Sequence, residues 1–380
     1  MKQQTAQEHL LHLLGIPSVN AKDDEGKAAE YLAEFFRAAG IEAKVWRIDA
    51  THANVTAFLK GRGAAAPTVW NGHLDTVAYG DRNEWNSDPA VPVIRNGRIY
   101  ARGASDMKSG LAAMTWALTE LAHNGTAPAG DITFLGTCDE EHSGRGASAI
   151  VAAGLLPKVR NILVGEPTGL NIGTAQKGCL WLSIEARGKT SHGAYPERGV
   201  NAVDCGYAVA EGIHTYVTSH THPLLGSATA QITEIEGGIA PNMTPDRCRI
   251  LMDIRMTPEL SAEAVTAEAE ELIREKTAET GGRFTAALSV KNHRLAVETA
   301  SEDPFAEQVR SSIRANGFEP KDIGINYFTD ASIFLRDAPE AKALLFGPGE
   351  PELCHQPDEY VELEKYEKAI QILQDLACKG

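Results

Sequence analysis

Apolar strand-like runs alternate with helical stretches through the first half of the chain, and this alternation limits its possible folds more than any other feature. The runs Thr68 to Trp70, Asp131 to Gly136 and Ile162 to Val164 are separated by helical spacing at Ser109 to Ala122 and Ala147 to Ala153. Strands joined through helices usually pair in parallel, so the pattern predicts an α/β fold with a mainly parallel sheet covered by helices. Ligand-bearing loops in such a sheet lie at the carboxyl ends of the strands.

The pattern changes at about Gly178 and resumes after Asp303. Between these points come a strand, a loop rich in Gly, Ser, His and Pro, and further strands and helices, which together predict a smaller α/β insert. A chain of 380 residues is also long for one domain. We therefore expect a discontinuous larger domain, residues 1–177 and 293–380, with an inserted domain at residues 178–292.

Charge and cysteine content narrow the possible partners and the cellular location. A net formal charge of −15, without a local Lys/Arg cluster, disfavours nucleic acid and membrane as partners. The first residues lack a basic start followed by an apolar run, and no stretch reaches 18 apolar residues, so a cytoplasmic protein is expected. The six cysteines lie far apart without a CxxC pair, which predicts reduced thiols rather than disulfides or a cysteine metal site.

Imidazole and carboxylate side chains stand next to the predicted strands and helices, where a metal centre could form. In GHLDT, Asp75 follows His73 by two residues, so its carboxylate could hold the imidazole in the tautomer that binds a metal. In TCDEEHSG, three consecutive acids are unfavourable unless a cation lies nearby. Donors of this kind, without a thiolate, suit zinc, cobalt or manganese. The candidate donors are His73, Asp106, Glu140 or Glu141, Glu166 and His355.

Each of these residues also has a simpler interpretation when taken alone. A histidine near a strand end is often capped or exposed, and an aspartate before a helix, such as Asp106, is often an ordinary N-cap. The acidic run could be an exposed turn.

Seven motifs in order make the chain resemble a known family. They are GHLDTV, GASDMKSG, DEEHSG, VGEPT, KTSHGAYPERGVNA, IAPNMTP and CHQPDEY, and they extend over essentially the whole chain. The family is that of the di-zinc peptidases and deacylases, which includes acetylornithine deacetylase, succinyl-diaminopimelate desuccinylase, aminoacylase and bacterial glutamate carboxypeptidase. The resemblance implies a zinc-peptidase-like catalytic domain, with the insert serving as lid and dimerisation domain of a homodimer.

The resemblance also assigns roles to the residues of the predicted metal centre. Asp106 would bridge two divalent metal ions, with zinc expected first and cobalt or manganese as alternatives. His73 and Glu166 would complete one metal site, and Glu141 and His355 the other. Asp75 would orient His73. Glu140, the first glutamate of the pair, would be the general base that takes a proton from the attacking water.

Further residues are implied to contact the substrate, three of them in the insert. His192 would reach the active site of the partner subunit and donate to the oxyanion, while Asn242 would contact the substrate. Arg255 would pair with a substrate carboxylate, because a planar guanidinium suits bidentate recognition. The alternatives are a loop histidine packed beside a tyrosine and a surface ion pair of the arginine. Thr329 matches a loop that lines the substrate pocket in the deacylases. In this chain the loop, Asn326 to Ala331, lacks the glycines found in the family.

Three functions follow in order of expectation. The first is a metal-dependent amidohydrolase that cleaves the amide bond of a small N-acyl amino acid. The second is a dipeptidase or carboxypeptidase that uses the same machinery on a short peptide. The third is a non-catalytic binding relative, which the complete set of ligands and base argues against.

Overall fold

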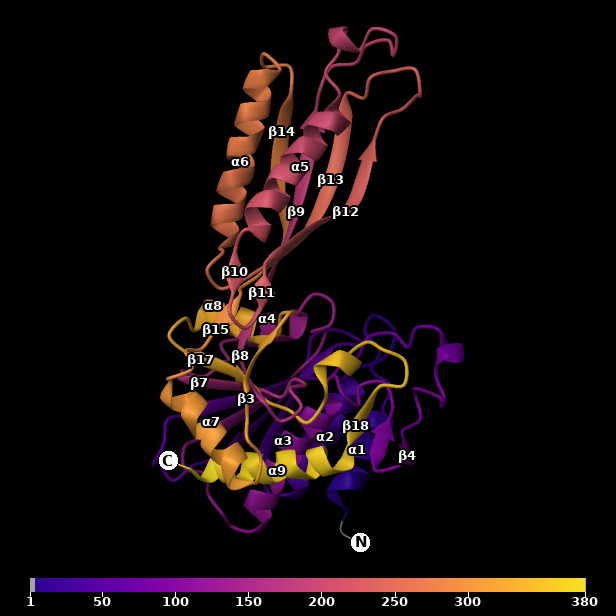
Figure 1. Ribbon diagram of the computed structural model, residues 1–380. Helices are drawn as coiled ribbons and strands as arrows, with labels where there is room; N and C mark the ends of the chain where they lie inside the picture. The colour runs from indigo at the N-terminus through magenta and orange to yellow at the C-terminus, as the bar shows by residue number, and fades with distance from the viewer. Residues whose placement is uncertain (1–3, 380) are drawn as a thin grey trace. The chain divides into compact units, whose positions relative to one another are not determined.

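The computed structural model describes residues 4–379, and the chain divides into two compact units (Figure 1). Unit 1 comprises Met1–Thr174, Glu298–Ile323 and Thr329–Gly380, and unit 2 comprises Ala175–Val297 and Gly324–Phe328. Residues 1–3 and 380, which the sequence assigns to the larger domain, lie outside the described residues. Among residues 4–379, no helix is both long enough and apolar enough to cross a membrane.

A large sheet runs through unit 1, and its four central strands are parallel. The strand order is β1-β2-β6-β3-β7-β17-β8-β15, with β16 beside β8. Strand β3 pairs in parallel with both β6 and β7, β17 pairs in parallel with β7, and antiparallel pairs flank this centre. The strands are β1 (Glu42–Arg47), β2 (Ala53–Leu59), β3 (Thr68–His73), β6 (Ile132–Thr137), β7 (Asn161–Val164), β8 (Ile172–Gln176), β15 (Val297–Glu298), β16 (Asp322–Ile325) and β17 (Lys342–Leu345).

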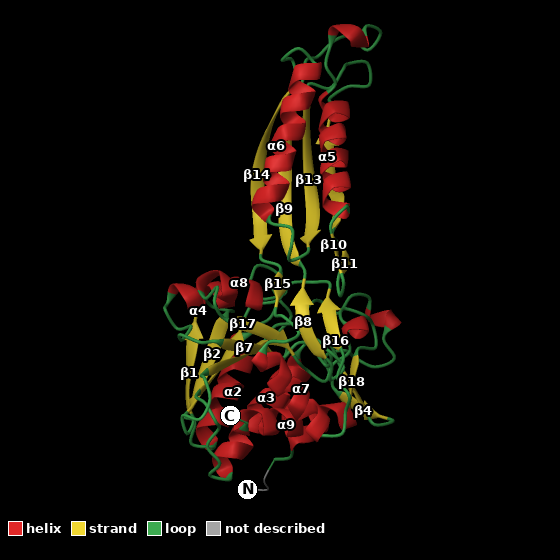
Figure 2. Cartoon of the chain, turned by 60° about the vertical axis from the view of Figure 1, so that its left-hand side comes forward, coloured by secondary structure: helices red, strands yellow, loops and turns green. Residues whose placement is uncertain are grey.

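Helices cover both faces of this sheet (Figure 2). One layer contains α1 (Ala6–Leu14), α2 (Gly26–Ala38), α3 (Lys108–His123), α7 (Pro304–Ala315) and α9 (Leu363–Cys378), and the other contains α4 (Arg145–Ala152) and α8 (Ala331–Asp337). Helix α3 is buried along most of its length, and its apolar side chains join those of α1, α2, α7 and α9 in one core. A small sheet of β4 (Val93–Arg95), β5 (Arg98–Tyr100) and β18 (Tyr360–Glu362) completes unit 1.

Unit 2 is an antiparallel sheet covered on one face by two helices (Figure 2). Its strand order is β12-β13-β9-β14, and alternate residues of β13 point into a core shared with the helices. The elements are β9 (Gly178–Arg187), α5 (Ala202–Thr218), β12 (Thr229–Gly237), β13 (Arg247–Met256), α6 (Ala262–Glu279) and β14 (Thr285–Arg294), with a short pair β10 (Thr221–His222) and β11 (Gly226–Ser227).

The predicted fold class, an α/β fold with a mainly parallel sheet and covering helices, is confirmed, with antiparallel strands at the edges of the sheet. The predicted insert began at residue 178 and ended at 292, whereas unit 2 runs from 175 to 297. Unit 2 also takes Gly324–Phe328, which the sequence placed in the larger domain. Strands β8 and β14 and helix α1 were not among the predicted elements, although Leu10, Leu13 and Leu14 of α1 are buried at helical spacing.

Candidate metal centre

The predicted metal ligands gather where neighbouring parallel strands of unit 1 end. His73 is the last residue of β3, Glu141 follows β6, and Glu166 follows β7. Because β6, β3 and β7 are adjacent and parallel, their carboxyl ends open at the same edge of the sheet. His355 follows β17, the next parallel strand, through a 3₁₀ turn at Pro351–Leu353. Asp106 lies in the loop that leads into α3, directly before Met107 at the N-cap of that helix.

Asp106 lies between two groups of donor atoms. Its Oδ1 atom is 3.2 Å from Nε2 of His73, and its Oδ2 atom is 3.4 Å from Nε2 of His355. Nε2 of His73 also lies 3.9 Å from Oε1 of Glu166, and Nε2 of His355 lies 3.1 Å from Oε2 of Glu141. Within each group of three residues, one donor atom per residue lies within 4.8 Å of the others. One carboxylate therefore joins two groups, each of which could hold a metal ion.

The chemistry of these groups fits divalent cations. Each group offers one imidazole nitrogen and carboxylate oxygens, which are ligands that zinc and related metals accept. Oε1 of Glu141 is buried and has no hydrogen-bond donor among the described residues. A buried carboxylate oxygen without a donor is costly, and a cation beside it would remove that cost.

Burial and mutual repulsion perturb the titration of the carboxyl groups. Burial raises the pKa of Glu166 well above its usual value, and the charge of Asp106 adds to the effect. Burial alone would also raise the pKa of Asp106, but hydrogen bonds from His355 and His73 hold it well below its usual value. Hydrogen bonds to Asp106 and Glu141 raise the pKa of His355 to about 10. Protons on the imidazoles thus balance part of the negative charge that metal ions would otherwise balance.

The orientation of His73 is held by the backbone of Asp75 more closely than by its side chain. Nδ1 of His73 lies 3.0 Å from the carbonyl oxygen of Asp75 and 3.6 Å from its carboxylate oxygen Oδ1. A proton on Nδ1 can donate to this carbonyl, and in the neutral ring the lone pair of Nε2, on the side of Asp106, would then be available to a metal ion. The carboxylate of Asp75 accepts instead from the backbone N–H groups of Glu140 and Glu141, at 3.2 and 3.1 Å. Asp75 thus contacts both His73 and the acidic loop.

Glu140 belongs to neither donor group, although it directly precedes Glu141. Its side chain is buried, and burial raises its pKa well above the usual value. The negative charges of Asp330 and Glu166 act in the same direction, while His73 acts against them. A buried carboxyl with a raised pKa, next to the donor groups but outside them, makes Glu140 a candidate for proton transfer.

Two buried charged side chains that were not predicted from the sequence hold the loop of Asp106. Oε1 of Glu359 accepts hydrogen bonds from the backbone N–H groups of Ser105 and Asp106, at 2.7 and 2.9 Å. Arg102 pairs with Glu359 at 2.6 Å and also donates to the carbonyl oxygen of His355. Glu359 lies in the motif CHQPDEY, four residues after His355, and this closeness in sequence was the only indication that it lies near the metal centre.

The predicted residues His192 and Asn242 lie next to each other in unit 2. The N–H of Gly193 donates to the carbonyl oxygen of Asn242 at 2.8 Å, and His192 forms an isolated bridge with Met243. His192 is exposed, and its Nδ1 atom accepts from the N–H of Ala194 at 3.0 Å. In the neutral ring the proton is therefore on Nε2, which can donate outward. The substrate contacts of both residues stay predictions.

Arg255 is held by a neighbour on its own strand. Its Nε and Nη2 atoms donate to the two carboxylate oxygens of Asp253, at 2.9 and 3.1 Å. The ring of Phe328 lies 5.6 Å from its guanidinium carbon, so the bulky residue of the predicted pocket loop packs against this arginine. A substrate carboxylate would have to use the remaining N–H groups. Thr329 is buried in unit 1, where its hydroxyl oxygen accepts from the N–H of Ala331.

Relatives with named functions align with nearly the whole chain. A probable succinyl-diaminopimelate desuccinylase of Staphylococcus epidermidis is 26% identical, in an alignment that covers 97% of this chain and 97% of that protein. An acetylornithine deacetylase of Aliivibrio fischeri is 28% identical, in an alignment that covers 98% of this chain and 97% of that protein.

A solved structure and a family model agree with this alignment. A dinuclear metal-binding peptidase of the M20 family from Bacillus subtilis has a TM-score of 0.74 and 16% sequence identity, over 98% of this chain and 96% of that chain. Residues 69–379 match the model of the peptidase family M20/M25/M40. The resemblance inferred from the seven motifs is thereby confirmed, and the protein belongs to the peptidase family M20/M25/M40.

Proposed function

We propose that this hydrolase of the M20 family cleaves the amide bond of a small N-acyl amino acid, with Glu140 as general base beside two divalent cations. The observation that carries the proposal is the position of Asp106, whose two oxygens each face a different imidazole. The relatives named above as a desuccinylase and a deacetylase support the deacylase reaction. Zinc is the expected metal, with cobalt or manganese as alternatives.

The residues of the centre divide the work of hydrolysis between them. His73, Asp106 and Glu166 would hold one cation, and Asp106, Glu141 and His355 would hold the other. When bound, the two cations would lower the pKa of water and polarise the carbonyl group of the substrate amide.

Glu140 would take a proton from the attacking water and return it to the leaving nitrogen. Burial of the carboxyl raises its pKa well above the usual value, which makes its carboxylate a stronger proton acceptor than that of an exposed glutamate. Asp75 would support this transfer, because its carboxylate accepts from the backbone N–H groups of Glu140 and Glu141.

A panel of substrates tests the choice between a deacylase and the second candidate, a dipeptidase or carboxypeptidase. Zinc- or cobalt-loaded protein is expected to release acetate from N-acetylornithine, or succinate from N-succinyl-diaminopimelate, faster than it cleaves dipeptides. Product release is measured by chromatography with mass detection. Turnover of dipeptides alone would reject the deacylase proposal in favour of a peptidase, and failure of every substrate with metal bound would favour a binding relative.

We further propose that the active unit is a homodimer, in which the exposed His192 donates through Nε2 to the oxyanion in the partner's site. Mixing Glu140→Ala protein with His192→Ala protein is then expected to restore activity, because a mixed dimer contains one site with an intact base and an intact histidine. Random exchange in a symmetric dimer would place about half of the molecules in mixed dimers. Each mixed dimer has one intact site out of two, so the recovered rate should approach about a quarter of the parental rate.

Subunit exchange must be measured in the same samples, by native mass spectrometry of tagged chains. Mixed dimers without recovered activity would show that His192 does not act across the interface. A monomer with full activity in sedimentation would reject the dimer itself.

A further inference from the structure

Three consecutive backbone N–H groups of the acidic loop, residues 139–141, donate to two buried carboxylates. The N–H groups of Glu140 and Glu141 donate to the two oxygens of Asp75. The N–H of Asp139 donates to Oε2 of Glu25 at 2.9 Å. Asp139 has a positive φ of 58°, a conformation that a residue with a side chain keeps only when its surroundings hold it. Hydrogen bonds to Asp75 and Glu25 therefore fix the backbone that carries the proposed base, Glu140, and one proposed ligand, Glu141.

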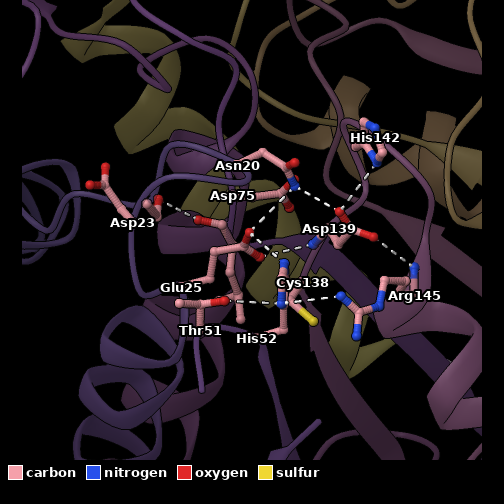
Figure 3. A network of polar contacts seen from close by, with 12 residues as sticks. Asn20, Asp23, Glu25, Thr51, His52, Asp75, Cys138, Asp139, His142 and Arg145 are labelled. Atoms are coloured by element: carbon pink, nitrogen blue, oxygen red, sulfur yellow. Dashed lines mark hydrogen bonds and ion pairs between the residues drawn. The ribbon is translucent and has the colours of Figure 1, made fainter. Parts of the chain in front are cut away.

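The side chain of Asn20 lies between these carboxylates (Figure 3). Its amide nitrogen is 2.9 Å from Oδ1 of Asp139, 3.1 Å from Oδ2 of Asp75 and 3.4 Å from Oε1 of Glu25. The backbone N–H of Asn20 is itself held by the carbonyl oxygen of Thr76 at 2.9 Å. One amide group thus joins three carboxyl groups that would otherwise repel one another.

Glu25 occupies the N-cap position of α2, but its carboxylate does not cap that helix. The side chain is fully buried and turns toward the acidic loop instead. Burial and the charges of Asp75 and Asp139 raise the pKa of Glu25 to about 9. A glutamate placed only to end a loop or begin a helix would keep its carboxylate at the helix terminus, where the dipole stabilises it.

We propose that Glu25 is a positioning residue of this hydrolase, which holds the acidic loop through the N–H of Asp139 so that Glu140 and Glu141 keep their places. The proposal rests on the proposed function for its effect on catalysis, but its effect on metal binding does not depend on the substrate. The carboxylate of Glu25 also contacts Asn20 and His52, but the backbone N–H that it accepts belongs to the loop that supplies Glu141. We therefore expect it to act on the group of Asp106, Glu141 and His355. The other group shares Asp106 but takes nothing from this loop.

Two substitutions separate the hydrogen bond from the space that the side chain fills. Glu25→Met removes the acceptor at similar volume. It is expected to weaken binding of the Co²⁺ ion at Asp106, Glu141 and His355 by about 10–100-fold, with a similar loss of kcat and little change in KM. Glu25→Gln keeps an oxygen that can accept from the N–H of Asp139, and it is expected to stay within about threefold of the parent on the same principle. Calorimetric titration with Co²⁺, with the visible spectrum of the bound ion, measures both sites.

A control and a second variant keep the test independent of folding. Asp303→Ala removes a carboxylate acceptor from the backbone N–H of Phe305 at the start of α7, and it should lower the melting temperature without changing Co²⁺ affinity. Asn20→Ala removes the amide between the carboxylates and should weaken the same Co²⁺ site as Glu25→Met. It decides the outcome if Glu25→Met does not fold.

Two results would overturn the proposal. Parental Co²⁺ affinities and parental kcat in Glu25→Met or in Asn20→Ala, with only a lower melting temperature, would make the network purely structural. A Glu25→Gln protein as impaired as Glu25→Met would show that the hydrogen bond to Asp139 is not the cause. If the parent binds two Co²⁺ ions and hydrolyses nothing, the proposed function fails, while the Co²⁺ titrations still decide the role of Glu25.

Discussion

Replacing Glu140 by glutamine is expected to lower kcat by about 10²- to 10⁴-fold, which is the usual contribution of a general acid and base. The substitution keeps the size of the side chain but removes its ability to accept a proton. Glu140 lies in neither donor group, so metal content measured by mass spectrometry should remain parental. KM should change little, because a residue that only transfers a proton in the chemical step does not contribute to substrate binding.

The adjacent residue provides a matched control. Glu141→Gln makes the same chemical change one position further along the same loop, but it alters the group that contains Asp106 and His355. It is expected to lose one metal ion, whereas Glu140→Gln keeps both. The assignment of base and ligand is wrong if Glu140→Gln hydrolyses substrate at the parental rate with both ions bound, or if the two variants exchange these results.

Removal of the metal ions is expected to abolish activity and to lower the melting temperature by on the order of 10 °C. A ligand present at a thousandfold its dissociation constant stabilises the fold by about 4 kcal/mol, and in a domain of this size each kcal/mol shifts the melting temperature by about 2–4 °C. The physical reason is the crowding of carboxylates around Asp106, which cations would offset. Added Zn²⁺, Co²⁺ or Mn²⁺ should restore both properties.

The loss of stability in chelated protein is also expected to grow as the pH rises. Burial raises the pKa of Glu359 from 4.5 to about 7, and that of Glu140 well above 4.5, so the folded state holds these protons more tightly than the unfolded chain. Their stabilising effect is complete below pH 4.5 and is lost as the pH rises toward the folded pKa. His355, raised from 6.5 to about 10, likewise loses its contribution between those values.

Thermal unfolding at pH 6 and pH 9, with and without chelator, checks this expectation. The melting temperature of the chelated protein should fall between the two pH values. The difference between loaded and chelated protein should widen, because protons compete with metal ions for the same side chains. Chelated protein that is more stable at pH 9 than at pH 6 would contradict the proposed charge balance at the centre.

The sequence alone predicted the fold class and the candidate ligands. Apolar runs of strand length alternating with amphipathic helices are a local property of the chain, so β3, β6, β7 and the long helix α3 could be predicted from their residues. The ends of parallel strands meet at one edge by geometry, so polar residues that follow such runs could be expected to gather. His73, Glu140 and Glu166 follow this rule, and the structure places His73, Glu166 and the adjacent Glu141 in the two donor groups. The choice of Glu141 over Glu140 as a ligand came from the family resemblance.

Only the tertiary structure decided how those residues are held. Nothing in the local pattern indicates that Glu25, in the segment before α2, or Glu359, beside β18, accepts the backbone N–H groups of ligand loops far away in the chain. These hydrogen bonds arise because burial obliges every N–H to find an acceptor, and the nearest acceptor depends on packing between distant segments. For the same reason, sequence spacing suggested the carboxylate of Asp75 as the partner of His73, whereas the structure brings the backbone carbonyl closer and turns the carboxylate to the acidic loop.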